Sequence, residues 1–236
     1  MKRALTLLLA ALMVYTLAAC GGHAATPDTS HDAPQIKELY HEDLDYTDGV
    51  GNNGHFTYRV PQIAADTQGA ADINKSIEET YGPIVKEVLD TVSGGFSLSC
   101  LYIAWESYPY GDILSLVVSS GWDGDMNSYH VYLYDISSGQ QLTTADLLSA
   151  LNVGETAFLD AVRQTAAERF DDQYSDMPED AALAERRDWT LSDENINMDV
   201  PAYADAAGKL HVVLPIGSIA GAEAYEQVLT LGAIGQ

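Results

Sequence analysis

The middle of the chain contains a long apolar segment with one polar interruption, LSCLYIAWESYPYGDILSLVVSS, at residues 98–120. Residues 98–106 and 112–120 are apolar and rich in residue types that favour strands. The segment between them, Ser-Tyr-Pro-Tyr-Gly at 107–111, has the composition of a turn. The stretch therefore predicts a β-hairpin near the centre of a sheet.

Further strands are expected on both sides of this hairpin. Residues 129–136 predict a third strand in series, closed by Ser-Ser-Gly at 137–139, where glycine can adopt the positive φ of a short turn. Residues 55–60 alternate between apolar and polar and are expected to end at Pro61, which cannot donate to a ladder. The remaining strand candidates are residues 198–203, 209–214 and 225–231.

Helices are predicted where apolar residues recur at helical spacing. One covers residues 70–91, and Pro83 is expected to kink or divide it. Another begins at Thr-Thr-Ala-Asp at 143–146, which fits a capping box, and a longer one covers residues 155–170. Strands and helices fall in blocks and do not alternate. This order favours an α+β fold with a mainly antiparallel sheet and helices packed on one face.

The N-terminus has the features of an export signal. Lys2 and Arg3 precede an apolar run at residues 4–17. Leu-Ala-Ala-Cys at 17–20 resembles the lipobox of bacterial lipoproteins, in which the cysteine receives a diacylglyceryl group and the signal is cut just before it. The resemblance implies that acylated Cys20 anchors the protein in the lipid bilayer, on the extracytoplasmic face of the cell membrane. An ordinary signal peptide and a membrane-spanning helix are the alternatives.

These features divide the chain into three expected parts. Residues 1–19 are the signal peptide, and residues 20–34 are small, polar and turn-forming, as in a flexible tether. Residues 35–236 are expected to form a single α+β extracytoplasmic domain, which is long enough to bury a core without disulfides. The polar segment 171–185 fits a loop or a loosely packed helix, so a division into two domains stays open.

The chain is strongly acidic, with 35 Asp and Glu against 11 Lys and Arg and a formal net charge of −24. Removal of residues 1–19 takes away Lys2 and Arg3 and brings the net charge to −26. A chain of this charge repels nucleic acid, and it attracts a cation or a basic protein at rates that depend on salt. Solubility alone is the other interpretation of such a surface.

The sequence contains no motif for catalysis or for cofactor binding. It has no P-loop, no dinucleotide fingerprint, no nucleophile elbow and no pair of histidines at metal-binding spacing. His130 and His211 fall in expected strands, where a structural role is favoured. Cys100 lies in an apolar run, where a small buried side chain is expected. The sequence therefore predicts no catalytic residue, no cofactor and no metal site, and it favours a protein that is not an enzyme.

A polar segment at residues 123–127, Asp-Gly-Asp-Met-Asn, places three oxygen-bearing side chains at alternate positions. Calcium favours such ligands, but the glycine and the bidentate glutamate of an EF-hand are missing, so a plain polar turn is the other interpretation. Aromatic side chains in loops beside such carboxylates favour ligand contact, with packing against the fold as the alternative. The candidate ligand contacts are Trp122, Asp123, Asp125, Tyr108 and Tyr110.

Three segments carry a family resemblance, and they are YRVPQI with DINKSI at 58–63 and 72–77, YDISSGQQLTTADLL at 134–148, and LPIGSIAG at 214–221. Together they resemble the extracellular domain of RsiV-type anti-sigma factors. The first is similar to the family's Y-x-x-P-x-I and I-N-x-x-I opening, and the segments occur in the family's order over about residues 50–232. The family's Gly-Gly-Ala-His patch is replaced here by SGWDGDM at 120–126.

The resemblance implies an α+β domain outside the membrane that binds lysozyme in some relatives and lies near peptidoglycan in others. It implies no catalytic residue. We therefore expect a membrane-anchored binding or sensing module whose ligand is lysozyme or a cell-wall component such as peptidoglycan. A hydrolase or accessory enzyme acting on cell-wall polymers is the alternative, because carboxylates are abundant. A purely structural envelope lipoprotein is a third interpretation.

Overall fold

The computed structural model describes residues 32–47, 51, 53–91, 100–122, 126–178 and 180–234. The expected signal peptide, Cys20 and most of the expected tether lie outside the described residues. Asp123 and Asp125, with the calcium site considered for them, also lie outside these residues. No helix in the described part of the chain is long and apolar enough to cross a membrane.

The described strands form two sheets. One has the strand order β1 (Ile36–Thr47), β2 (Asn53–Ile63), β3 (Cys100–Tyr110), β4 (Ile113–Trp122), β5 (Met126–Asp135) and β6 (Gln141–Leu142), and the other has the order β7 (Ala202–Ala204), β8 (Leu210–Gly217) and β9 (Ala224–Thr230). The helices are α1 (Gln68–Thr91), α2 (Thr144–Ala150), α3 (Glu155–Gln173) and α4 (Ala181–Thr190). Neighbouring strands are antiparallel except β2 and β3, which are parallel. The expected α+β class with a mainly antiparallel sheet is confirmed.

The predicted central hairpin is formed by β3 and β4, and β5 pairs with the other edge of β4. Its turn is shorter than the sequence predicts, because β3 continues through Tyr110. The turn consists of Gly111 and Asp112, and Gly111 has φ +57°. The loop placement expected for Tyr108, Tyr110 and Trp122 is therefore wrong, since the two tyrosines belong to β3 and Trp122 is the last residue of β4.

A long hairpin of β1 and β2 forms one edge of the larger sheet. The expected end of the strand at Pro61 is wrong, because β2 continues to Ile63. Pro61 pairs with Glu38 beside a shift in register between Glu38 and Tyr40, and such an irregular pairing tolerates the missing donor of proline. β1 occupies a segment for which the sequence predicts no strand.

β4 is buried on both faces, which explains the continuous apolar run in its sequence. Leu116 faces a first core between the six-stranded sheet and α1, to which α1 contributes Ile73 and Ile77. Its neighbour Val117 faces a second core, which includes the three-stranded sheet and Phe158 of α3. Successive side chains of a strand point to opposite faces, so this one strand takes part in both hydrophobic cores.

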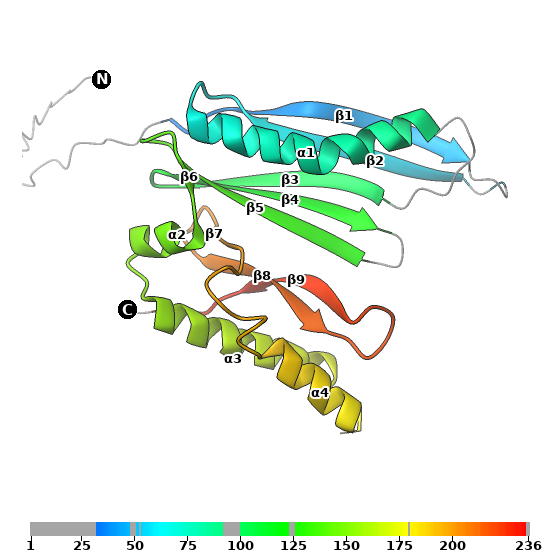
Figure 1. Cartoon of the computed structure of the whole chain (residues 1–236), viewed down its shortest axis with the longest axis vertical. Coiled ribbons are helices and arrows are strands. Elements are labelled where there is room, and N and C mark those ends of the chain that lie inside the picture. The colour runs from blue at the N-terminus through cyan, green and yellow to red at the C-terminus, as the bar shows by residue number, and fades with distance from the viewer. Residues whose placement is uncertain are drawn as a thin grey trace, which may run out of the picture.

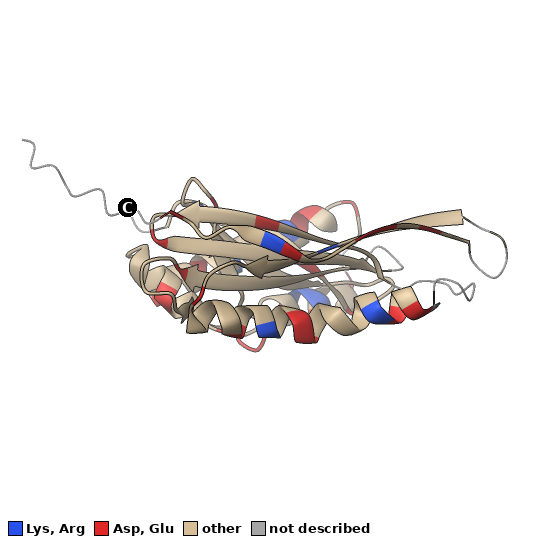
Figure 2. Ribbon diagram, turned by 90° about the horizontal axis from the view of Figure 1, so that it is seen from above, with Lys and Arg blue, Asp and Glu red and all other residues tan. Residues whose placement is uncertain are grey.

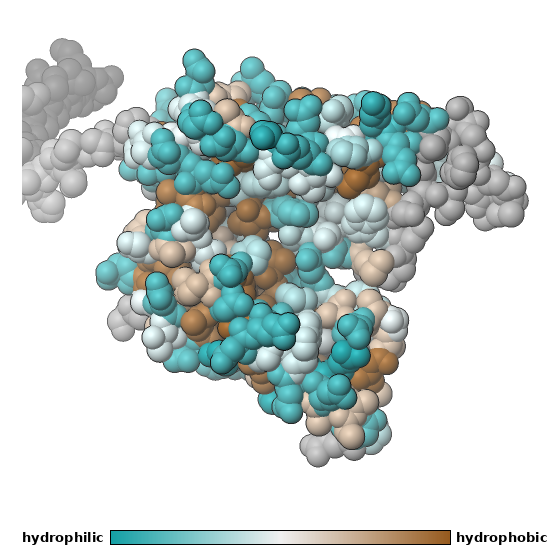
Figure 3. All heavy atoms as spheres, in the orientation of Figure 1, coloured by the Kyte–Doolittle hydropathy of each residue, from teal (hydrophilic) through white to brown (hydrophobic). Residues whose placement is uncertain are grey.

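The two sheets are stacked between the long helices. Figure 1 shows α1 across the six-stranded sheet at one end of the molecule, α3 and α4 at the other end, and the three-stranded sheet between them. Glu226 of β9 joins the sheets, because it accepts a hydrogen bond of 2.8 Å from the backbone N–H of Tyr129 in β5. Figure 3 shows hydrophilic residues over α1 and apolar residues gathered in the band between α1 and α3. Each sheet thus carries its long helices on one face.

The helices follow the sequence patterns. α1 runs through Pro83 without division, and its axis bends along its length in Figure 1. Thr143 and Asp146 form the predicted capping box of α2. The polar segment 171–185 contains the end of α3 and the start of α4, so part of it is helical.

Candidate functional site

Tyr110, the last residue of β3, is exposed over 39% of its surface, more than the other described candidate contacts. Its ring packs over Gly208, in the turn between β7 and β8. A Cβ at Gly208 would lie 2.5 Å from the ring, and the φ of +77° at this residue also favours glycine. Asp205 holds the turn by accepting hydrogen bonds of 2.8 and 2.9 Å from the backbone N–H groups of Ala207 and Lys209. Tyr110 therefore rests on a fixed turn.

Two hollows flank Tyr110. One, of about 470 Å³, lies toward α2, and its lining includes Asp112, Asp135 and Asp146. The other, of about 420 Å³, lies toward β8 and the C-terminal residues, and its lining includes Lys209. A ligand side chain can therefore reach the ring of Tyr110 from either side.

Two carboxylates of the first hollow are held ionised by hydrogen bonds. Partial burial of Asp135 opposes its ionisation, but the hydrogen bonds that it accepts from Ser137 and Ser138 outweigh burial and lower its pKa. The pKa of Asp146 is lowered by the hydrogen bonds that it accepts from the hydroxyl and the backbone N–H of Thr143. This hollow therefore carries negative charge at neutral pH and suits a cationic group.

Trp122 lies far from Tyr110 along the same hairpin. Tyr110 pairs with Ile113 at one end of β4, whereas Trp122 is at the other end. Trp122 is partly buried against the first core, and its indole N–H donates a hydrogen bond of 3.1 Å to the hydroxyl of Ser120. The structure therefore does not bring Trp122 and Tyr110 together into one surface.

Tyr108 belongs to a stack of rings that joins the two sheets. It stacks on Tyr203 of β7 with ring centroids 5.6 Å apart, and Tyr203 stacks on His211 of β8 at 4.8 Å. The ring nitrogens of His211 lie 3.2 Å from a carboxylate oxygen of Asp205 and 3.1 Å from the hydroxyl of Thr230. Burial, with nearby carboxylates, raises the pKa of Tyr203 to about 12. Tyr108 is therefore packed in the fold, as the alternative interpretation expects.

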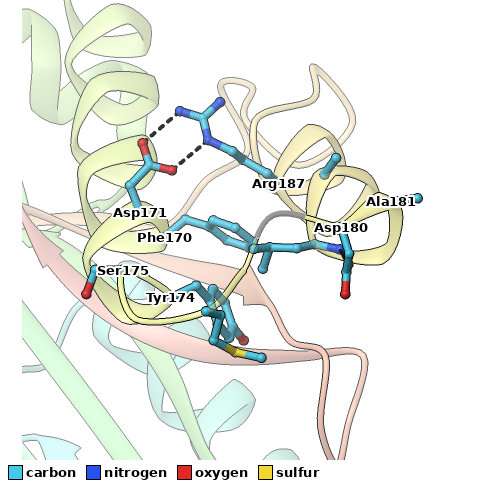
Figure 4. A pocket seen from close by; sticks show the side chains of 10 residues that line it. Phe170, Asp171, Tyr174, Ser175, Asp180, Ala181 and Arg187 are labelled. Atoms are coloured by element: carbon cyan, nitrogen blue, oxygen red, sulfur yellow. Dashed lines mark hydrogen bonds and ion pairs between the residues drawn. The ribbon is translucent and has the colours of Figure 1, made fainter.

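A larger hollow, of about 720 Å³, lies between the end of α3 and the start of α4 (Figure 4). Phe170, Tyr174 and Leu183 are apolar or aromatic members of its lining. At one side the guanidinium of Arg187 donates hydrogen bonds of 2.7 and 2.9 Å to the two carboxylate oxygens of Asp171. No sequence pattern predicts this hollow, because it arises from the placement of two helices. The sequence indicates only that α3 has an apolar face, which ends at Phe170 beside the hollow.

Outside these hollows, Cys100 and His130 fit structural roles. Among the described residues, no group of three or more His, Cys, Asp and Glu side chains could hold a metal ion. Cys100 is free and buried, and burial raises its pKa to about 11, so its thiol stays protonated at neutral pH. Nδ1 of His130 lies 2.8 Å from the hydroxyl of Tyr81, and burial lowers the pKa of His130.

The likeness that comparison with known proteins found is one of structure. The chain matches no family model and none of the curated proteins. Among solved structures it is similar to a member of the DUF3298 family from Bacteroides fragilis NCTC 9343, with a TM-score of 0.36 and 11% sequence identity over 85% of this chain and 94% of that chain. No residue role is transferred from that protein.

Proposed function

We propose that this protein is a membrane-anchored extracytoplasmic binding module whose ligand is a basic protein, with lysozyme as the first candidate. The observation that carries the proposal is the exposed ring of Tyr110 beside the ionised carboxylates of Asp135 and Asp146. At exposed sites an aromatic face attracts a lysine or arginine by about 0.5–1 kcal/mol. Nearby carboxylates add Coulomb attraction, and the two hollows give such a side chain room to approach.

The charge of the whole surface supports a basic partner. Each arginine of the described residues has a carboxylate at 4.0 Å or less, and these arginines are Arg59, Arg163, Arg169, Arg186 and Arg187. Figure 2 shows acidic residues spread over the helices and strands, with fewer basic residues among them. The remaining carboxylates therefore set the sign of the surface potential, which speeds the approach of a basic protein at low salt.

The N-terminal sequence and the resemblance to RsiV-type domains support the location and the ligand. Acylated Cys20 would hold the protein at the membrane, and residues 20–34 would let the folded part extend away from the membrane surface. The resemblance implies lysozyme as one ligand and peptidoglycan as another. Because the first hollow beside Tyr110 is anionic, it suits a basic protein such as lysozyme better than an uncharged ligand.

Capture of lysozyme by vesicles that carry the acylated chain tests this proposal. We expect binding at low salt that weakens steeply as salt is added. The substitution Tyr110→Ala removes the ring and should weaken binding about threefold to tenfold, whereas Tyr110→Phe keeps the ring and should stay within about twofold. Absence of capture at low salt would refute the choice of lysozyme. Equal capture by Tyr110→Ala and the parent chain would refute the site at Tyr110.

A hydrolase acting on cell-wall polymers is the second candidate, and one observation favours it. His211 lies within hydrogen-bond distance of the carboxylate of Asp205 and of the hydroxyl of Thr230, which is the arrangement of an oriented base beside a nucleophile. The test is release of soluble fragments from purified peptidoglycan by the parent chain and by His211→Gln. Fragment release by the parent chain that His211→Gln abolishes would favour the hydrolase. Equal release by both chains would show that His211 takes no part in the reaction.

A further inference from the structure

The hollow between α3 and α4 has no part in the site around Tyr110. Its volume of about 720 Å³ falls in the range of about 300–1,000 Å³ that is usual for ligand sites. The last turn of α3, the first two turns of α4, and Tyr174, Ser175, Met177 and Asp180 between the two helices supply its lining. Figure 4 shows the side chains from these segments around one space.

One wall of this hollow is apolar and only partly covered. Phe170 is buried and forms the base of this wall, and the partly buried Tyr174 packs against it with ring centroids 4.8 Å apart and planes at 52°. Leu183 is partly buried, and Met177 is exposed over 44% of its surface. Methionine side chains adapt to apolar groups of different shapes. The wall therefore suits one apolar side chain of a partner.

The hollow is held in place by contacts at its borders. The paired hydrogen bonds between Arg187 and Asp171 tie α4 to α3. The hydroxyl of Tyr174 donates a hydrogen bond of 3.3 Å to the backbone carbonyl of Gly217 in β8. The carboxylate of Asp180 caps α4 by accepting a backbone hydrogen bond of 2.8 Å. Because the walls are fixed in advance, a partner loses little free energy in ordering them.

The rim of the hollow favours a positive charge. The hydrogen bonds from Arg187 outweigh partial burial and lower the pKa of Asp171, so this carboxylate stays ionised and largely cancels the charge of Arg187. Asp180 adds another carboxylate to the lining. The C-terminal end of α3 and the N-terminal end of α4 both border this space, so the negative end of one helix dipole is offset by the positive end of the other. The carboxylate of Asp180 therefore leaves the local charge negative.

We propose that this hollow binds a short segment of a basic protein, with an aromatic or aliphatic side chain against Tyr174 and Met177 and a neighbouring lysine or arginine at Asp180. The inference rests on the proposed function for the basic character of the partner. It adds a second contact region, separate from Tyr110, and it names the two kinds of side chain that the partner must present together.

Two blocked peptides test the side-chain requirement directly. The probes are acetyl-Ala-Phe-Lys-Ala-amide and acetyl-Ala-Phe-Glu-Ala-amide, added to the full mature chain carrying Cys20→Ser so that no acyl chain is attached. Binding is followed by the NMR signal of the methyl group of Met177, which is assigned by its loss in Met177→Leu. We expect the Phe-Lys peptide to shift this signal saturably and the Phe-Glu peptide to bind at least about tenfold more weakly, because its carboxylate meets the negative rim.

A pair of substitutions on one helix locates the binding. Ala184 lines the hollow and is exposed, whereas Ala182 is exposed on the same helix and lines a different, smaller hollow. Arginine is nearly as good a helix former as alanine, so both variants should fold, which circular dichroism checks. Ala184→Arg fills the hollow and adds positive charge, and it should weaken the Phe-Lys peptide at least about tenfold. Ala182→Arg should stay within about twofold.

The outcomes separate this inference from the proposed function. An unmoved Met177 signal, equal binding of the two peptides, or equal effects of the two arginine substitutions would each overturn the inference. These readouts need no lysozyme, so the specificity of the hollow can stand even if vesicles fail to capture lysozyme. A different outcome would leave the proposed function standing without the second contact region. In that case Ala184→Arg would capture lysozyme as well as the parent chain does, and neither peptide would bind.

Discussion

At the scale of single residues, the surface around Tyr110 depends on Gly208. An alanine there would bear a strained φ of +77° and would place its Cβ 2.5 Å from the ring of Tyr110. We expect Gly208→Ala to lower the free energy of unfolding by about 2–4 kcal/mol, from backbone strain and steric overlap together. Urea denaturation measures this change.

Gly111 supplies the matched control for that substitution. It also has a positive φ, of +57°, but nothing lies within 4 Å of the position that its Cβ would take. Gly111→Ala should therefore cost only the strain, about 1 kcal/mol. Equal losses for the two variants would contradict the close contact between Gly208 and Tyr110.

Two histidines are expected to titrate on opposite sides of the ordinary histidine pKa of 6.5. The hydrogen bond from His55 to Asp45, with attraction from Asp43, outweighs slight desolvation and raises the pKa of His55. Burial lowers the pKa of His130, although Glu226 opposes this effect. NMR titration of the ring protons should give a midpoint above 6.5 for His55 and below 6.5 for His130.

Because the pKa of His55 is raised in the folded state, its contribution to the free energy of unfolding should fall as pH rises. Its charged form is favoured in the folded state, so its contribution is complete below pH 6.5 and is lost as pH rises through the folded pKa. The free energy of unfolding of the parent chain, minus that of His55→Gln, should therefore decline over this pH range. A difference that grows with pH would show that the pairing of His55 with Asp43 and Asp45 is absent in solution.

At the scale of secondary-structure elements, α2 depends on its capping box. Thr143→Ala removes the hydroxyl that accepts a hydrogen bond of 3.2 Å from the backbone N–H of Asp146. The expected loss is about 1 kcal/mol in the free energy of unfolding, measured by chemical denaturation. Thr143→Ser keeps a hydroxyl and should retain most of the stability. If Thr143→Ser lost as much as Thr143→Ala, the cap would not be the cause.

The elements that the sequence predicts well are those with an unbroken period. The strands of the central hairpin, the capping box at Thr143 and the helix over 155–170 all carry a clear pattern, and all are present. β1 lacks an unbroken pattern, because the register shift between Glu38 and Tyr40 changes which positions face the core near the start of the strand. A bulge is set by pairing with another strand, so the sequence of β1 alone does not contain it.

The candidate site was predictable only in part, for a similar reason. Exposure of Tyr110 and negative charge nearby follow from local composition, but the carboxylates of Asp135 and Asp146 come from the end of β5 and from α2. In the sequence Trp122 is a candidate contact of the same kind as Tyr110. In the structure it lies at the opposite end of the hairpin, because β4 is ten residues long. Tyr108 is packed because β7, which is distant in sequence, supplies Tyr203. These placements depend on tertiary structure and not on local pattern.

At the scale of the whole molecule, β4 couples the two cores. Leu116→Ala creates a cavity in the first core and Phe158→Ala creates one in the second, since both side chains are fully buried. We expect losses of about 2–5 and 3–5 kcal/mol respectively. Calorimetry should show one unfolding transition in the parent chain, which both substitutions shift to lower temperature. Two transitions that respond separately would mean that the cores unfold independently.

The reaction rate of the buried thiol of Cys100 can report how often the first core opens. The thiol is protonated and covered by the first core, so a thiol reagent can react with it only while that core is open. In a chain whose Cys20 is acylated, the labelling rate of the single remaining thiol would report how often the start of β3 is exposed. A partner that binds only the closed form would slow this reaction, and its engagement could then be followed on intact membranes without a second label.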